Sequence, residues 1–323
     1  MKSRYFLNWT TLLLSGLLLS CASKKSAPLE SQKSEVKNLV ESSPESSKKL
    51  IESFCVEAAG VYEKNKWGKF TCPTFEAFSF GKSVKGRDLI YFDLGDKNSK
   101  ALTLIQCGIH GDELPALPMC LNLLEEIQSG RRVVAKKTRL IVQILVNPDG
   151  MFAVPPTRQN ARGVDINRNF PTKDWKSDAL DSWKKRDRED QRKFPGSTPN
   201  SEPETQAVVK FINDFKPQKI IAIHTPLGFL DLDSHGDSIQ ERRAKYLAIN
   251  MSKNSGNYRF IRFGFYPGSL GNYAGRYKKI PVYTLELPAG VTSPTVDNYW
   301  KKFRIALWRA IDFDLSTGTF VED

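Results

Sequence analysis

The sequence is poor in the residue types that most often bind metals or form disulfides, with three histidines and five cysteines in 323 residues. Any metal site that uses imidazole must therefore draw on His110, His224 and His235. No internal repeat is visible at the periods of solenoids or propellers, which argues against those architectures. The apolar share of 40% and the scattered aromatic residues are typical of a soluble globular enzyme, not of a disordered or fibrous chain.

Acidic residues are also fewer than basic ones: the sequence has 36 Asp and Glu and 48 Lys and Arg, which gives a net charge of +12. Lys2 and Arg4 contribute two of these charges, so the chain without its first twenty residues keeps 12 − 2 = +10. This balance favours polyanionic surroundings such as wall polymers or acidic lipid headgroups. The basic residues form no dense arm with interleaved aromatics, so we do not expect nucleic acid as a partner.

The first twenty residues have a basic start and an apolar run too short to span a bilayer comfortably, which is typical of an export signal. The following Leu18-Leu19-Ser20-Cys21 resembles the bacterial lipobox, which implies that Cys21 is acylated and becomes the first residue. Ordinary cleavage nearby, or retention of the leader as an anchor, is the alternative. We therefore expect an exported lipoprotein in the bacterial cell envelope, at the periplasmic face of the outer membrane.

Residues 21–48 are rich in Ser, Lys and Glu and poor in apolar residues, which predicts a disordered tether before one catalytic domain at 49–323. Cys55 and Cys72 could close a loop in a segment that looks poor in regular structure, and we predict this disulfide, worth about 3 kcal/mol by the chain-entropy argument. Cys107 and Cys120 fall in an apolar strand and an apolar helix, so we expect buried free thiols there.

Short β-rich runs alternate with helical patterns from residue 89 onward. The predicted strands are 89–94, 101–107, 139–146, 219–224 and 281–287, and the predicted helices are 113–128, 204–215, 238–254 and 296–313. Such alternation predicts an α/β fold with a mixed, largely buried sheet and helices on both faces. Ser201 and Glu204 have capping-box spacing at the start of the second helix. The charged stretch between Phe170 and Phe194 is typical of a solvated surface segment, and it could also border a site.

His110 and Glu113 follow a predicted buried strand with the spacing His-x-x-Glu, and His224 ends a second such strand. Ligands in open α/β folds bind at this edge of the sheet, and two imidazoles with one carboxylate suit a catalytic zinc ion with an open position. A histidine at a strand end can equally be satisfied by a hydrogen bond, so the spacing alone leaves both interpretations open. We assign His235 to a surface loop at residues 231–236.

The motifs together resemble those of zinc carboxypeptidases, in the same order along the chain. They are His110-x-x-Glu113, Asn147-Pro148-Asp149-Gly150, Gly163 to Phe170, His224 and Thr284-Leu285-Glu286. Within that family the chain is most similar to murein tripeptide amidases, through Gly81-Lys82-Ser83-Val84-x-Gly86, Thr157 to Asp165, Ser201 to Thr205 and Tyr266-Pro267-Gly268-Ser269. The resemblance implies a zinc carboxypeptidase-like α/β/α sandwich.

The resemblance also implies roles for individual residues. One Zn²⁺ would be held by His110, Glu113 and His224, with Asp165 behind His110 to fix its tautomer. Glu286 would be the general base toward a zinc-activated water.

Three further residues would contact substrate. Arg158 corresponds to the arginine that stabilises the oxyanion, and Asn167 with Arg168 correspond to the pair that binds a terminal carboxylate. The turn Asn147 to Gly150 would position the loop that carries Arg158.

The sequence departs from the family at the mobile tyrosine, because Phe263 stands near that position and Tyr266 and Tyr273 follow it. Either tyrosine could substitute, so we place neither in the catalytic set.

The expected reaction is hydrolysis of the γ-D-glutamyl–meso-diaminopimelate bond of peptidoglycan stem peptides. Asp231 and Asp233 are candidates for binding the distal ammonium group of diaminopimelate, and Leu270 is not the acid of an enzyme specific for Lys or Arg. Three alternatives stay open: a metallocarboxypeptidase on ordinary peptides, an aspartoacylase-like deacylase, and a non-catalytic lipoprotein that binds wall peptides. Oligomeric state is not predicted.

Overall fold

The structure is a computed structural model that describes residues 44–291 and 293–321. The predicted leader at 1–20, the lipidation residue Cys21 and the tether up to residue 43 lie outside the described residues. Residues 44–48, which we assigned to the tether, form the first turn of helix α2 (Pro44–Asn65). Within 44–291 and 293–321, no helix is long and apolar enough to cross a membrane.

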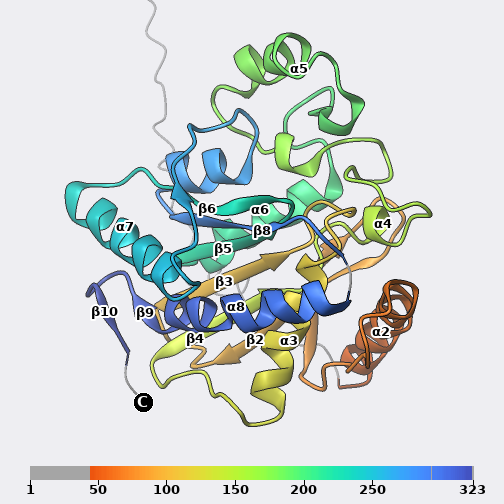
Figure 1. Ribbon diagram of the computed structural model, residues 1–323. Coiled ribbons are helices and arrows are strands. Elements are labelled where there is room, and N and C mark those ends of the chain that lie inside the picture. The colour runs from red at the N-terminus through yellow and green to blue at the C-terminus, as the bar shows by residue number, and fades with distance from the viewer. Residues whose placement is uncertain (1–43, 292, 322–323) are drawn as a thin grey trace, which may run out of the picture. The chain divides into compact units, whose positions relative to one another are not determined.

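Eight strands form one mixed sheet in the order β1-β2-β4-β3-β5-β8-β6-β7 (Figure 1). They are β1 (Ala77–Lys82), β2 (Asp88–Gly95), β3 (Ala101–Cys107), β4 (Thr138–Gln143), β5 (Lys219–His224), β6 (Leu227–Asp233), β7 (Phe260–Ile261) and β8 (Val282–Pro288). The central strands β4, β3, β5 and β8 run parallel, and β1 and β2 pair antiparallel with their neighbours. Strand β6 pairs antiparallel with β8 and parallel with β7. A small hairpin of β9 (Phe313–Asp314) and β10 (Thr319–Phe320) follows.

Helices cover both faces of the sheet, because alternate residues of the central strands face two separate apolar cores. Ile105 and Ile221 pack in the core that includes α2, α3 (Ala116–Gln128), α7 (Ser238–Lys253) and α8 (Ser293–Asp312). Leu104 and Ile220 pack in the other core, with α6 (Pro203–Phe215) and the helical segment η5 (Gly271–Tyr277). The predicted fold class is confirmed.

The strands predicted at 101–107 and 219–224 have the observed bounds. The prediction missed α2, β1 and β6. In α2, Phe54, Ala58 and Tyr62 are buried at helical spacing, a periodicity hidden by the Ser, Lys and Glu around them. The loop assigned to residues 231–236 was wrong for its first three residues, which end β6 in an alternation of apolar and acidic side chains. His235 is exposed, as expected.

The part of the chain that the structure describes contains two disulfides. Cys55 of α2 is bonded to Cys72, the pair that the sequence suggested. The expectation of free thiols at Cys107 and Cys120 was wrong, because these two are also bonded. Helix α3 folds back on β3, which brings Cys120 against the last residue of the strand with both side chains fully buried. The periodicity of the strand and that of the helix do not reveal how the two pack together, so nothing in the sequence indicated that the two cysteines are in contact.

Candidate active site

The ends of three parallel strands bring the candidate residues to one edge of the sheet. Cys107, at the end of β3, is in register with Ile223 of β5, and His224 at the end of β5 is in register with Glu286 of β8. His110 lies three residues beyond β3. Because parallel strands end at a common edge, residues far apart in the sequence meet there.

His110, Glu113 and His224 form a buried cluster whose potential ligand atoms lie within 4.8 Å of one another. Glu113 bridges the two imidazoles, with Oε1 2.7 Å from His110 Nδ1 and Oε2 2.9 Å from His224 Nδ1. Burial by itself would raise the pKa of Glu113, but the two histidines outweigh burial and hold it well below its usual range. Two imidazole nitrogens beside an ionised carboxylate fit the ligand set of a catalytic zinc ion.

Asp165 and Arg158 lie directly behind this cluster. Asp165 is fully buried, and its Oδ1 lies 3.1 Å from His110 Nε2 while its Oδ2 accepts a hydrogen bond from Arg158 Nε. Arg158 Nη1 also lies 3.2 Å from Glu113 Oε1. Burial would raise the pKa of Asp165, but Arg158 and His110 outweigh it and hold the pKa below its usual range. The aspartate is therefore placed to fix which nitrogen of His110 faces the cluster.

The loop that carries Arg158 is held by the turn at residues 147–150. Asn147 caps the short helix α4 (Pro148–Met151), and its Nδ2 donates to the carbonyl of Arg158. A Cβ on Gly111 would stand 2.2 Å from the carbonyl carbon of Gly150, so only glycine allows this close packing of the metal-ligand loop on the turn.

Two carboxylates hold the other end of the same loop. Asn160 Nδ2 donates to both Glu202 and Glu204, and Glu204 also accepts from the backbone N–H of Val84. The expected capping box is therefore not formed, although α6 begins at Pro203, one residue before the predicted start. These buried carboxylates anchor the loop between Arg158 and Asp165 instead.

Glu286 faces the same space from β8. It is 8% exposed, and its Oε2 accepts a hydrogen bond from the N–H of Leu227. Burial raises the pKa of Glu286, and the neighbouring charge of His224 offsets this only in part. Such a carboxylate is suited to accept a proton and return it.

One cavity of about 380 Å³ joins these groups. Its lining comprises His110, Glu113, Arg158, Asn167, Arg168, Arg192, Lys193, His224, Thr225, Pro226, Leu227, Thr284 and Glu286. Arg192 and Lys193 belong to the charged stretch, which forms short helical segments including α5 (Leu180–Lys185) and η4 (Gln191–Lys193). The stretch thus borders the site, a possibility that the sequence left open.

Comparison with known proteins identifies the family of this chain. Residues 69–237 match the family model for zinc carboxypeptidases. The chain belongs to the zinc carboxypeptidase family. Murein peptide amidase A of Vibrio campbellii is 30% identical over 230 residues, covering 70% of this chain and 84% of that protein.

Murein peptide amidase A of Escherichia coli is 34% identical over 160 residues, 49% of this chain, and the match spans only 62% of that relative. Among solved structures, murein-tripeptide amidase MpaA of Escherichia coli O157 has a TM-score of 0.55 at 25% identity, covering 76% of this chain and 94% of that one. Carboxypeptidase A of Helicoverpa armigera has a TM-score of 0.58 at 16% identity over 88% of this chain and 81% of that one, which shows the shared fold.

Neither Tyr266 nor Tyr273, the two tyrosines near the position of the family's mobile tyrosine, is among the residues that line the cavity. Tyr273 is buried and stacks on Phe170. The ring of Tyr266 lies between two guanidinium groups, because the Cζ atoms of Arg168 and Arg186 are each 3.8 Å from its centroid, and its hydroxyl donates to Asp187. Tyr266 therefore connects Arg168 to the charged stretch.

Asp231 and Asp233 lie further along β6, the strand whose first residue, Leu227, lines the cavity. Asp231 is in register with the lining residue Thr284 of β8. Asp231 is buried and accepts hydrogen bonds from the backbone of Leu232 and Phe263. Burial and the neighbouring Asp231 raise the pKa of Asp233 to about 8. Neither aspartate is among the residues that line the cavity.

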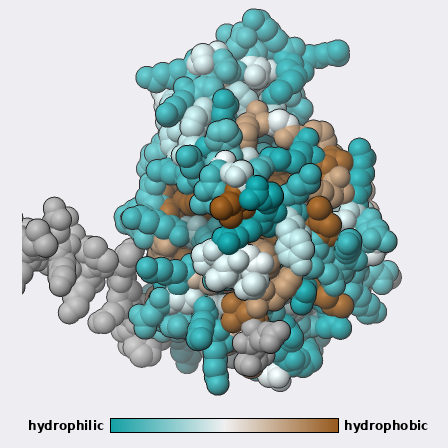
Figure 2. All heavy atoms as spheres, turned by 90° about the vertical axis from the view of Figure 1, so that its left-hand side faces the viewer, coloured by the Kyte–Doolittle hydropathy of each residue, from teal (hydrophilic) through white to brown (hydrophobic). Residues whose placement is uncertain are grey.

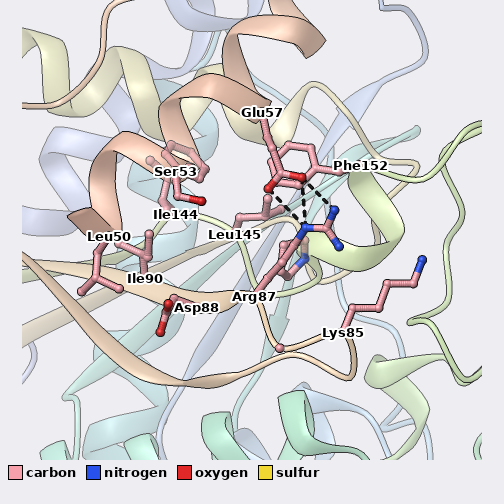
Figure 3. Close-up of a pocket in the computed structure, with 13 residues that line it drawn as sticks. Leu50, Ser53, Glu57, Lys85, Arg87, Asp88, Ile90, Ile144, Leu145 and Phe152 are labelled. Carbon is pink, nitrogen blue, oxygen red and sulfur yellow. Dashed lines mark hydrogen bonds and ion pairs between the residues drawn. The ribbon is translucent and has the colours of Figure 1, made fainter. Parts of the chain in front are cut away.

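A second pocket lies under α2, away from the cavity of the metal cluster (Figure 3). Arg87 at its centre forms hydrogen bonds with Glu57 of α2 and with Asp149, and its guanidinium lies over the ring of Phe152. Asp149 belongs to the turn at residues 147–150, so this ion-pair network ties α2 to the loop that carries Arg158. We assign this pocket a structural role.

Proposed function

We propose that this protein is a zinc-dependent peptidase that hydrolyses the γ-D-glutamyl–meso-diaminopimelate bond of peptidoglycan stem peptides. The observation that carries the proposal is the single cavity that joins the His110, Glu113 and His224 cluster to Glu286 and to Arg168. The choice of substrate is supported by the names of the relatives from Vibrio campbellii and Escherichia coli.

His110, Glu113 and His224 would hold a zinc ion, which would supply Lewis acidity to the site. Glu286 takes the proton from the water and delivers a proton to the leaving amine. Its partly desolvated carboxylate, with few hydrogen bonds, suits both transfers. Arg158, held by Asp165 beside Glu113, would stabilise negative charge on the carbonyl oxygen.

Arg168 is the candidate for binding the terminal carboxylate of the substrate. Its buried Nε has no hydrogen-bond partner among the described residues, and its Nη1 donates only to the neighbouring carbonyl of Asn167. The Oδ1 of Asn167 accepts from the N–H of Leu270, which orients the side chain and leaves its amide N–H₂ to donate. A planar guanidinium with a free N–H is suited to bind a carboxylate bidentately.

The test is to incubate the zinc-loaded protein and its Glu286→Gln variant with L-Ala-γ-D-Glu-meso-diaminopimelate and to follow products by mass spectrometry. We expect free diaminopimelate with the wild type alone. Cleavage of an α-linked peptide without release of diaminopimelate would instead indicate a general metallocarboxypeptidase. Activity on N-acetylaspartate alone would indicate a deacylase, and binding without any cleavage a wall-peptide-binding protein.

We also propose that the protein is exported and anchored through an acylated Cys21. The proposal is supported by the leader and the lipobox-like residues 18–21. Metabolic labelling with a radioactive fatty acid tests it. Wild-type protein should carry the label in the membrane fraction, whereas a labelled Cys21→Ala variant would refute the assignment.

A further inference from the structure

We infer that Arg192 and Lys193 form a second carboxylate subsite, which recognises the free α-carboxylate that a γ-linkage leaves on the residue before the scissile bond. The inference rests on the proposed function and deepens it. Both residues line the cavity that contains the metal cluster, and both come from η4, outside the motifs that identify the family.

Backbone and side-chain contacts fix η4 above the site. The carbonyl of Gln191 accepts a 2.6 Å hydrogen bond from Gln159 Nε2, next to Arg158. The carbonyl of Phe194 accepts a 2.8 Å hydrogen bond from the N–H of Asp165. Because both anchors adjoin residues behind the metal cluster, the segment 191–194 holds a fixed place relative to it.

Each cation is held in place but not enclosed. Arg192 Nη1 lies 2.7 Å from Asp112, which stands between the ligands His110 and Glu113 in sequence, and the Arg192 side chain is 58% exposed. Lys193 Nζ lies 3.0 Å from Asp187, and its side chain is 38% exposed. Both therefore retain N–H donors that can face a ligand in the cavity.

The cavity is therefore lined by cationic side chains at two places, Arg168 and Arg192, and each is held by a different part of the site. Arg168 packs on Tyr266, whereas Arg192 is tied to the loop that carries the metal ligands. A peptide cleaved at a γ-glutamyl bond has carboxylates on both sides of that bond: the terminal one on the amine side and the α-carboxylate on the acyl side. An ordinary α-linked peptide lacks the second. Arg168 and Arg192 therefore match the two carboxylates of a γ-linked substrate, one on each side of the scissile bond.

The segment that presents the two cations is the charged stretch between Phe170 and Phe194. It projects at the top of Figure 1, and Figure 2 shows that its visible surface is mainly hydrophilic. Trp183 packs against Phe194, which holds α5 onto the end of η4. We therefore infer that this segment serves specificity, by holding Arg192 and Lys193 at the cavity.

The test uses two tripeptides that differ in one group, L-Ala-γ-D-Glu-meso-diaminopimelate and the same peptide with the glutamyl α-carboxylate converted to a carboxamide. We expect the wild type to favour the acid by about 10-fold or more in kcat/KM, the range of one hydrogen-bonded charge. Arg192→Gln, Lys193→Gln and the double variant should lower kcat/KM for the acid and leave the amide unchanged. Lys185→Gln is the matched control, since Lys185 lies on the same segment, 76% exposed and paired with Asp181, and does not line the cavity.

Calorimetric titration of the zinc-loaded Glu286→Gln variant with both peptides gives a readout that does not depend on turnover. The acid should bind more tightly, and adding Arg192→Gln should remove the difference. Equal cleavage of the two peptides by wild type, or an equal loss on both in Arg192→Gln, would overturn the subsite and leave the proposed function intact. Cleavage of neither peptide, alongside cleavage of an α-linked one, would overturn both.

Discussion

Strand β5 buries a basic side chain at each of its ends, and the two environments differ. His224, the last residue, faces the Glu113 carboxylate beside the cavity. Lys219, the first residue, is fully buried, and its Nζ donates to the backbone carbonyl of Phe313. Burial lowers the pKa of Lys219 to about 7, although Asp314 and Asp312 oppose the shift. At the carboxyl end the buried Glu113 carboxylate lies between two imidazoles, whereas at the amino end the buried ammonium group is bonded to a backbone carbonyl.

The comparison separates two effects of buried charge: one end of β5 serves the chemistry of the site, and the other affects the free energy of unfolding. At the carboxyl end, the neighbouring histidines hold the pKa of Glu113 below its usual range, so this carboxylate stays ionised and in place for chemistry. At the amino end, the cost of burying the ammonium group should appear as a dependence of stability on pH. The predictions below test this contrast, from the largest expected effect to the smallest.

Glu286→Gln should lower kcat on the tripeptide by about 10³-fold, because the amide cannot accept the proton that the base must take. The zinc content should stay at the wild-type value, since Glu286 is not among the three clustered ligand residues. Steady-state kinetics and elemental analysis of the same preparations measure both. His224→Ala is the contrasting variant, and it should lose zinc. A Glu286→Gln enzyme with more than a tenth of the wild-type rate would contradict the assignment of the base.

Lys219→Met should change how stability depends on pH. In the wild type the folded pKa of about 7 lies below the value of 10.5 expected for the unfolded chain. Between these values the unfolded state binds more protons, so the free energy of unfolding should rise with pH by up to about 1.4 kcal/mol per unit. Below pH 7 both states are protonated and the full cost of burial is present.

Urea unfolding of wild type and Lys219→Met at several pH values between 6 and 10 measures this component as the difference between the two proteins. A Met side chain cannot titrate, so the variant should lack the rise. Parallel curves for the two proteins would show that Lys219 is not desolvated in the folded state.

Removing the Cys107–Cys120 disulfide by a double Ala substitution should cost about 3 kcal/mol of stability, as expected for a 13-residue separation. The Cys55–Cys72 bond, with a separation of 17, should contribute a similar amount. The two bonds should differ in their effect on the site, because Cys107 lies three residues before His110 and Cys55 does not adjoin a ligand.

Zinc competition assays on both double variants, each measured where it is folded, separate the two bonds. The Cys107/Cys120 variant should bind zinc more weakly than wild type, and the Cys55/Cys72 variant should match wild type. Equal zinc affinity in all three proteins would limit the Cys107–Cys120 bond to stability alone.

Asp165→Asn should weaken zinc binding by about 10- to 100-fold, as is usual for the residue behind a metal-binding histidine. The amide would face His110 Nε2 and Arg158 without a negative charge, so the imidazole would lose part of its basicity and its fixed tautomer. Competition with a chromophoric chelator measures the affinity. An affinity within a factor of two of wild type would show that Asp165 only holds Arg158.

Much of the site could be predicted from the sequence because its residues stand at the ends of strands that the sequence reveals. The runs at 101–105 and 220–223 are continuously apolar or β-branched, so the strands that contain them located His110 and His224. The pair Asn167 and Arg168 and the loop residue Arg158 depended on the family motif, since isolated arginines in a loop carry no periodic signal. Lys219 was counted as part of a strand, and its burial was not anticipated, because a lysine at a strand end is ordinarily exposed.

The sequence by itself determined the sheet that carries the site, the order of the metal-binding motifs and the family, since these depend on local periodicity and on spacing along the chain. Only the tertiary structure decided that Cys107 meets Cys120, that Glu202 and Glu204 hold Asn160, and that Arg192 and Lys193 border the cavity. The physical reason is the same in each case. These contacts join segments whose approach is set by the packing of helices and loops on the sheet, and no local pattern in the sequence encodes that approach.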